Sequence, residues 1–214
     1  YSTNTSDTEA LKELDRLSEI LVGLQDGRVR FRMRLAGEAE SLRALWQEGA
    51  PLEAYAFVLE EEIRFASYQM SGEEENLAAD LNRSGGELWS RLQESISSEL
   101  STLWDEKQGT RKSVTELRAL AFDPDRSVRE RAYRKELKLW ESVETAMAHA
   151  MNGVKGFAAT VNKRRGHESD LQRSVMQARL SRKALDTMID VMRESLPFFR
   201  TYLSDKARVL GVDR

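Results

Sequence analysis

The stretch that decides the fold is residues 123–165, which read DPDRSVRERAYRKELKLWESVETAMAHAMNGVKGFAATVNKRR. Apolar side chains recur every three or four residues along it, which is the period of one helix face: Val128, Ala132, Tyr133, Leu137, Trp140, Val143, Met147, Ala150, Val154, Phe157 and Val161. Asp123 can cap the first amides, and Pro124 can take the first helical position, where it needs no N–H. The pattern predicts one long helix over about 124–164, a rod of roughly 50–60 Å.

This rod is too long for a compact bundle of 214 residues, so we expect it to reach toward another part of the protein. Gly153 and Gly156 lie on it, and each lowers helix stability by about 1 kcal/mol relative to alanine. We expect them to allow the close approach of another backbone. Arg165 and Gly166 are predicted to end the rod.

Upstream of the rod, the same period and a set of capping and breaking signals predict a series of helices. The first is expected to start at the capping box of Ser6 and Glu9 and to end at Gly27, and the next two are expected over Val29–Gln47 and Leu52–Ala66. A fourth is expected from the capping box of Ser71 and Glu74 to Gly85-Gly86, and a fifth over Leu88–Leu100.

The chain around and after the rod is also expected to be helical. A polar stretch, residues 105–111, is the clearest loop, and Ser113 with Glu116 opens a short helix. Two segments follow the rod, one with Leu171 and Val175 and one over 185–192, with Pro197 kinking or restarting the last helix. No stretch alternates with period two over a useful length, so no sheet is expected. The predicted fold class is all-α, with many helices.

Composition excludes several classes of protein. The chain is 40% hydrophobic and 32% charged, and it contains no cysteine, so disulfides, thiolate metal sites and cysteine nucleophiles are ruled out. No stretch approaches the roughly 18 consecutive apolar residues that a membrane span needs. Tyr1–Glu9 lacks the apolar region of a signal peptide. We expect a soluble, cytoplasmic protein with no membrane partner.

Charge divides the chain into two parts. Residues 1–110 hold 11 Lys and Arg against 22 Asp and Glu, whereas residues 111–214 hold 22 against 14. We predict an acidic helical subdomain over 1–110 and a basic helical segment over 111–214. Such a split occurs in nucleic-acid-binding proteins and in proteins whose parts meet through complementary charge. No nucleic-acid motif accompanies the basic half, so no nucleic-acid partner is predicted.

One near miss to a zinc-peptidase motif occurs, at His167-Glu168-Ser169-Asp170-Leu171. The motif needs a second histidine where Leu171 stands, because two ligands must lie one helical turn apart. His149, the other histidine, lies 18 residues upstream and cannot supply it. We expect His167 at a partly exposed turn and His149 in or at the edge of the core.

The runs of acidic and basic residues in the chain are explained by helix structure and do not predict a binding site. The glutamates of 60–62 and 73–75 point in different directions on a helix, so neither run converges on one cation. Glutamates 73–75 also suit the positive end of a helix. The basic residues between 126 and 138 are expected to wrap around the rod as a solvated face with local ion pairs, and not to form one stripe: Arg126, Arg129, Arg131, Arg134, Lys135 and Lys138. No catalytic, cofactor-binding or metal residue is predicted in this chain.

Several short stretches past residue 119 carry a resemblance to a known family: Leu120–Arg129, Ala132-Tyr133, Asn152–Gly156, Arg164–Ser169, Leu196–Leu203, Lys206-Ala207 and Leu210-Gly211. In this order and spacing they resemble the oligoendopeptidase F family of zinc peptidases. Met70–Glu75 and Leu88–Leu92 resemble the amino-terminal lobe of that family more loosely, and residues 1–69 do so only in helical character. The resemblance covers about two thirds of the chain.

The resemblance implies the amino-terminal lobe of a longer, all-helical clamshell enzyme that cleaves short peptides. In that family a His-Glu-x-x-His helix and a further glutamate hold zinc, and these lie downstream of the part that this chain resembles. This chain alone is therefore expected to bind no zinc and to be inactive, to form one wall and lid of a groove, and to pack on the downstream catalytic lobe. The alternative is a non-enzymatic helical module that binds a protein partner.

Overall fold

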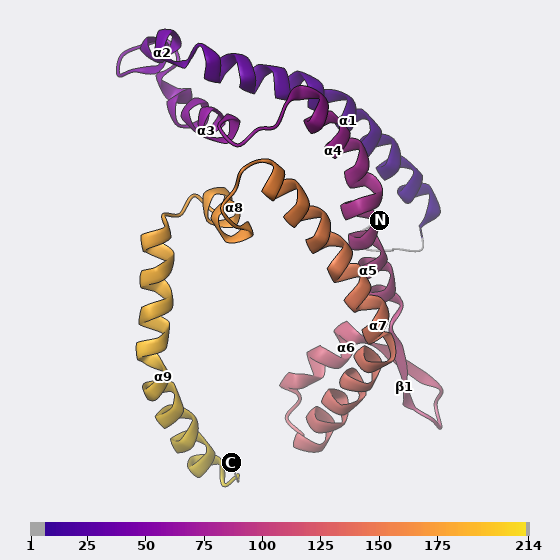
Figure 1. Ribbon diagram of the computed structural model, residues 1–214. Helices are drawn as coiled ribbons and strands as arrows, with labels where there is room; N and C mark the ends of the chain where they lie inside the picture. The colour runs from indigo at the N-terminus through magenta and orange to yellow at the C-terminus, as the bar shows by residue number, and fades with distance from the viewer. Residues whose placement is uncertain (1–6, 213–214) are drawn as a thin grey trace. The chain divides into compact units, whose positions relative to one another are not determined.

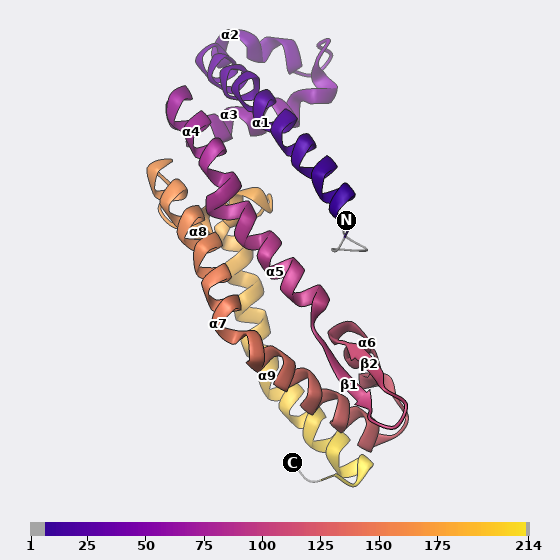
Figure 2. The same ribbon diagram turned by 90° about the vertical axis from the view of Figure 1, so that its right-hand side faces the viewer.

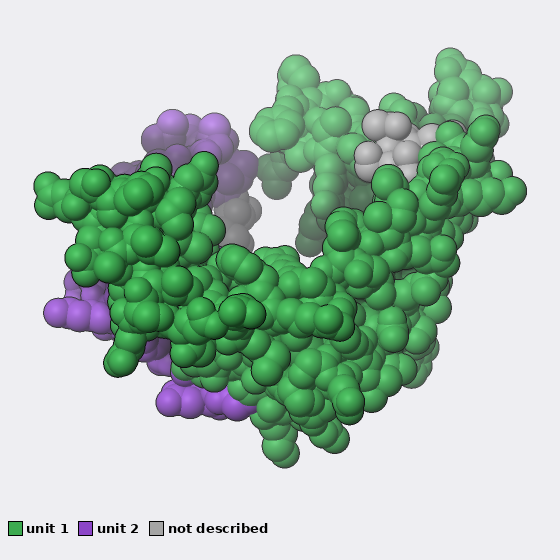
Figure 3. All heavy atoms as spheres, turned by 90° about the horizontal axis from the view of Figure 1, so that it is seen from above, with its two compact units in different colours: residues 1–165 green, residues 166–214 purple. Residues whose placement is uncertain are grey.

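A computed structural model describes residues 7–212 (Figure 1). The chain forms two compact units, residues 1–165 and residues 166–214 (Figure 3). Helices make up nearly all of the regular structure, which confirms the all-α fold class. The boundary drawn from charge at residue 110 falls inside the first unit, at the start of a strand, so charge and compactness divide the chain differently. No helix of residues 7–212 combines the length and apolarity that crossing a membrane requires.

The first helix, α1, runs unbroken over Thr8–Gly37. The predicted end at Gly27 is wrong. A glycine lowers the stability of a helix by only about 1 kcal/mol, and the burial of Val29 and Leu35 compensates for this loss. The Oδ1 atom of Asp7 accepts hydrogen bonds from the first-turn amides at 2.9 and 3.1 Å and caps the helix. Ser6, the predicted cap, lies outside the described residues.

Short turns then lead to a helix that packs against α1. They are α2 (Ala39–Leu42), η1 (Arg43–Trp46) and η2 (Glu53–Tyr55), followed by α3 (Ala56–Ala66). The helix predicted over 29–47 is therefore the end of α1 followed by α2 and η1. Glu62 of α3 forms ion pairs with Arg28 and Arg32 of α1, and the Arg32 guanidinium lowers the pKa of Glu62 despite its partial burial.

Helices α4 (Gly72–Asn82) and α5 (Leu88–Glu99) form one continuous element through the π-helical turn η3 (Arg83–Glu87). The capping box at Ser71 and Glu74 is confirmed. The predicted end at Gly85-Gly86 is wrong, because these glycines serve packing. A Cβ at Gly85 would lie 2.8 Å from the ring of Phe157.

A β-hairpin follows, and the expectation of no sheet is wrong. β1 (Ser101–Asp105) pairs antiparallel with β2 (Thr110–Ser113), with a register shift between Leu103 and Asp105. Contacts within the turn itself stabilise the hairpin. The Asp105 carboxylate accepts hydrogen bonds from two backbone N–H groups of the turn, and Gly109 adopts a left-handed φ of +64°. Strands of four or five residues are too short to show alternation, so only the polar turn was visible in the sequence.

Helix α6 (Val114–Ala119), capped by the predicted box at Ser113 and Glu116, and the turn η4 (Leu120–Phe122) lead into α7 (Arg126–Arg164). The long helix is confirmed, but its cap is Asp125 and not Asp123. Asp123 instead accepts a hydrogen bond from the Asp125 amide at 2.9 Å.

Helix α7 lies beside α5 in both views (Figures 1 and 2). Gly153 makes this possible, since a Cβ there would lie 2.6 Å from the indole of Trp89 on α5. A close approach thus occurs at Gly153, but the expected partner is wrong, because the Trp89 side chain and not another backbone makes the contact. At Gly156 the expectation is wrong, because no atom lies within 4 Å of the Cβ position. The same helix buries Ala132 and Ala150.

The second unit holds α8 (Asp170–Gln177) and α9 (Arg182–Leu210). Ser169 and Ser181 cap them, and Gly211 ends α9 with a φ of +61°. Pro197 lies inside α9, so the helix does not restart there. Many apolar side chains of α9 are exposed: Met188, Ile189, Val191, Met192, Leu196, Phe198, Phe199, Tyr202, Leu203, Val209 and Leu210.

The contact between Gly153 and Trp89 yields a prediction about stability. Gly153→Ala should destabilise the chain by about 1–3 kcal/mol, because the added methyl group overlaps the indole. The matched control, Gly156→Ala on the same helix, should stabilise it by up to about 1 kcal/mol, since alanine favours helix and nothing opposes its methyl group. Urea unfolding followed by circular dichroism measures both. Midpoints shifted in the same direction would contradict the packing argument.

Candidate functional site

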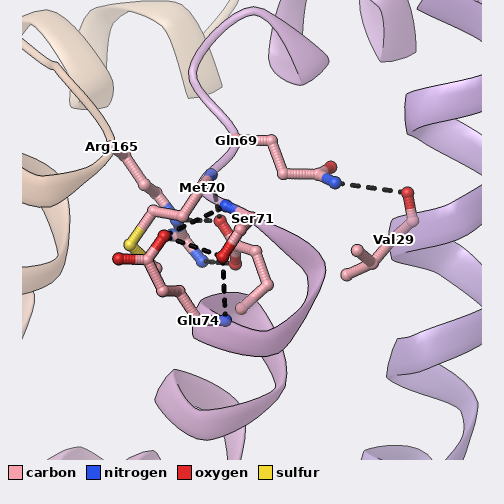
Figure 4. A network of polar contacts seen from close by, with 7 residues as sticks. Val29, Gln69, Met70, Ser71, Glu74 and Arg165 are labelled. Carbon is pink, nitrogen blue, oxygen red and sulfur yellow. Dashed lines mark hydrogen bonds and ion pairs between the residues drawn. The ribbon is translucent and has the colours of Figure 1, made fainter.

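The most buried charged group in the described chain is Glu75, near the start of α4, with 3% of its surface exposed. Its carboxylate accepts two hydrogen bonds from the Arg165 guanidinium, at 3.0 and 2.6 Å. It accepts a third from the backbone N–H of Met70 at 3.1 Å. Figure 4 shows Arg165, at the end of α7, close to Met70 and Ser71, which directly precede α4.

The charge state of Glu75 follows from these contacts. Burial of the Glu75 carboxyl opposes its ionisation, but the hydrogen bonds from Arg165 and Met70 outweigh burial, so the pKa of Glu75 lies below its ordinary value. The carboxylate is ionised, and Arg165 binds it in a bidentate pair. A carboxylate that is buried and held in this way has no proton to donate to a substrate. Its role is structural.

Neighbouring contacts tie the cluster to α1. The amide of Gln69 donates a hydrogen bond to the Val29 carbonyl oxygen at 3.2 Å, and Val29 itself is 2% exposed (Figure 4). The residue after Met70 is Ser71, which caps α4. The short segment 69–71 thus connects three helices of the first unit.

The near-miss zinc motif, residues 167–171, does not lie on one helix, because only its last two residues are helical. His167 lies half-buried in the turn before α8, as expected, and α8 begins only at Asp170. Glu168 is exposed. His149 is exposed on α7, so its expected place in or at the edge of the core is wrong. No three His, Asp or Glu side chains among residues 7–212 gather closely enough to hold a metal ion.

The acidic run on α3 diverges, as helix geometry predicts. Glu60 accepts hydrogen bonds from Arg43 at 2.9 Å and from the Trp46 indole at 3.1 Å, and both lower the pKa of Glu60. Glu61 pairs with Arg64, on its own helix. Each glutamate therefore has its own structural partner.

A groove of about 890 Å³ runs along the amino-terminal half of α7, beside β1. We call it the basic groove. Its lining comes from α7 together with one residue of β1: Thr102, Ser127, Glu130, Arg131, Arg134, Lys135, Leu137, Lys138, Leu139, Glu141 and Ser142.

Two cations of the basic groove are fixed by the hairpin. The Arg131 guanidinium stacks on the Trp104 ring, 4.0 Å from its centroid, and donates a hydrogen bond to the Trp104 carbonyl oxygen. The Lys135 ammonium donates to the Leu103 carbonyl oxygen at 2.7 Å. Backbone carbonyls orient these side chains without neutralising their charge.

The remaining two cations differ in their contacts. Arg134 pairs with Glu130 at 2.7 Å, the kind of local ion pair that was expected. Lys138 makes no ion pair with any residue in the described part of the chain. The expectation that the basic residues form no stripe is wrong for these four, because residues 131, 134, 135 and 138 repeat at helical spacing. That spacing was visible in the sequence.

A second groove, of about 450 Å³, lies between α1 and the α4–α5 element. Ion pairs cross it, from Arg83 to Glu19 at 3.2 Å and from Arg91 to Asp15. Because these charges pair with each other, they hold the helices together and offer little to a ligand.

One comparison with known proteins gives a match to a family model. Residues 35–101, less than half of the chain, match the model described as Oligopeptidase F, which represents an amino-terminal domain of metallopeptidases. We call residues 35–101 the oligopeptidase F segment. No curated protein and no solved structure matches the chain.

The oligopeptidase F segment runs from the last turns of α1 to the first residue of β1. It contains Glu75 and Trp89, so it includes one partner of each main contact with α7. It confirms the looser resemblance at Met70–Glu75 and Leu88–Leu92, and it also covers residues 35–69, where only helical character was expected. The stretches quoted from residue 120 onward lie outside it.

The Glu75–Arg165 pair yields a prediction. Glu75→Gln should destabilise the chain by about 3 kcal/mol at neutral pH, because it leaves a largely buried guanidinium without its counter-charge. The matched control, Glu73→Gln, changes an exposed glutamate two residues away and should cost less than about 0.5 kcal/mol. Chemical denaturation of both variants measures the difference.

The pH dependence supplies a second readout of the same pair. The folded-state pKa of Glu75 lies below its ordinary value of 4.5. Its contribution to stability is therefore complete above pH 4.5 and disappears as the pH falls through the folded-state pKa. The stability gap between the wild type and Glu75→Gln should narrow over that acid range. A gap that stays constant would contradict an ionised pair.

Proposed function

We propose that this chain is the amino-terminal lobe of a zinc metalloendopeptidase that hydrolyses short peptides. The observation that carries the proposal is the oligopeptidase F segment at residues 35–101. The resemblance of later stretches to oligoendopeptidase F supports it. In this proposal the zinc ligands, a His-Glu-x-x-His helix and a further glutamate, lie in a catalytic lobe downstream of residue 214.

Exposed apolar side chains support the existence of a further lobe. In the first unit, Leu21 and Leu24 on α1 are 66% and 64% exposed. In the second unit, Phe198 and Leu203 on α9 are 69% and 61% exposed. Exposed apolar surface that gathers into a large patch marks interaction sites in soluble proteins. A catalytic lobe that packs on these helices would bury it.

The described residues do not fit zinc, since no suitable group of His, Asp or Glu side chains lies among residues 7–212. We therefore assign no catalytic step to them. Their proposed role is to form a wall and lid of the substrate groove and to select peptides by length. We also propose a cytoplasmic location, in keeping with a sequence that contains no cysteine.

The first test is to read the coding frame past the codon for Arg214. We expect it to continue into a His-Glu-x-x-His sequence followed by a glutamate, because two histidines one helical turn apart and a third ligand complete a zinc site. A stop codon directly after Arg214 would contradict the proposal. The alternative, a non-enzymatic helical module that binds a protein partner, would then be preferred.

The second test concerns the 214-residue chain alone. It should hydrolyse none of a series of quenched fluorescent peptides and should retain no stoichiometric zinc after dialysis, because the ligand set is incomplete. Metal analysis and peptidase assays measure this, with the longer enzyme as the positive control. Zinc-dependent turnover that co-purifies with the short chain would show that its residues do carry a site.

A further inference from the structure

We propose that the basic groove binds an acidic segment of a short peptide in an extended conformation. The inference rests on the proposed function, since it names a class of peptide that the enzyme would prefer. It concerns α7 and β1 alone, both of which lie in the first unit.

The first argument is the balance of charge. Four cations line the groove against two carboxylates, Glu130 and Glu141. Two of the cations, Arg131 and Lys135, are held by carbonyl oxygens of β1 and keep their full charge. Lys112 adds a further cation at the hairpin, with its ammonium 5.9 Å from the centroid of the Trp104 ring. A concave surface with excess positive charge concentrates anionic ligands.

The second argument is the availability of two side chains. Lys138 has no ion-pair partner among residues 7–212. Arg134 shares one carboxylate oxygen of Glu130, and its side chain remains 73% exposed. Both can therefore bind a carboxylate without breaking a buried contact. Arg134 retains guanidinium donors for a bidentate pair.

The third argument is spacing. Arg134 and Lys138 are four residues apart on α7, which is about 6 Å along the helix axis. In an extended peptide, side chains two residues apart point the same way and are separated by about 6.6 Å. Acidic residues at alternate positions of the peptide would thus meet both cations at once. Leu137 and Leu139, in the same lining, offer apolar contact to the side chains that lie beside them.

A peptide suits this groove better than a nucleic acid. The carboxylates of Glu130 and Glu141 lie within the lining and would repel a continuous row of phosphates. The same carboxylates can accept hydrogen bonds from peptide N–H groups. The net charge of the chain is -3, which also disfavours a polyanion.

The test is titration calorimetry on the 214-residue chain at low ionic strength with the peptide acetyl-Glu-Ala-Glu-Ala-Glu-amide. Lys138→Glu should weaken binding about tenfold, because it replaces an attraction by a repulsion. Lys138→Gln should weaken it less, in the same direction. The matched control is Lys155→Glu, an equal change of charge at an exposed position of the same helix outside the groove, and it should alter the affinity less than about twofold.

Three results would overturn the inference: no binding of the acidic peptide, equal binding of its glutamine counterpart, or an equal loss in Lys155→Glu. Tighter binding of a single-stranded oligonucleotide of equal charge would overturn the choice of a peptide. Circular dichroism verifies that each variant keeps its helices. If the peptide does not bind although a zinc motif follows residue 214, this inference alone fails. If the peptide binds and no such motif follows, the proposed function fails, but the inference that the basic groove binds an acidic peptide is retained.

Discussion

The first unit depends on one constraint, the burial of an ion pair between residues 90 positions apart, Glu75 and Arg165. An ionised carboxylate can be buried only when its lone pairs are satisfied, and Arg165 and the Met70 amide satisfy them. Because Arg165 caps the end of α7 and Glu75 begins α4, the pair fixes the position of a 39-residue helix at one end. Such a pair contributes geometric specificity rather than a large net stability, since desolvation offsets much of the attraction.

The rest of the unit accommodates the helix that this pair fixes. Along its middle, α7 presents Gly153 to Trp89 and Phe157 to Gly85, so close packing there relies on glycine. At its start, α7 directs Arg131 and Lys135 to carbonyl oxygens of β1. Hydrogen bonds from charged side chains thus act at both ends of α7, and apolar contacts act between them. The hairpin, which has only two short strands, gains from α7 the support that an isolated hairpin lacks.

The sequence predicts those features whose causes are local. The period of apolar residues is enough for α7, and the capping boxes at Ser71 and Ser113 place two helix starts correctly. It fails where distant contacts override a local signal. Gly27 predicts a helix end, yet α1 continues past it because Val29 and Leu35 are buried. The pairing of Glu75 with Arg165 has no local signal at all, since Glu75 reads as one of three acidic residues in a first turn. The stripe from Arg131 to Lys138 has a local signal, its helical spacing, but Arg126 and Arg129 precede it and do not line the groove, so the full basic set does not show the stripe.

The placement of the basic groove relative to the family segment bears on function. The oligopeptidase F segment ends at Ser101, the first residue of β1, whereas the groove is built from Thr102 and α7. The segment supplies Trp89 and Glu75, which position α7, but it supplies none of the cations that line the groove. The residues that position α7 and the residues that line the basic groove are therefore separate in the chain. Under the proposal that the groove binds acidic peptides, a change in the charge of Lys138, which takes part in none of the packing contacts, would alter peptide preference while the Glu75–Arg165 pair keeps α7 in place.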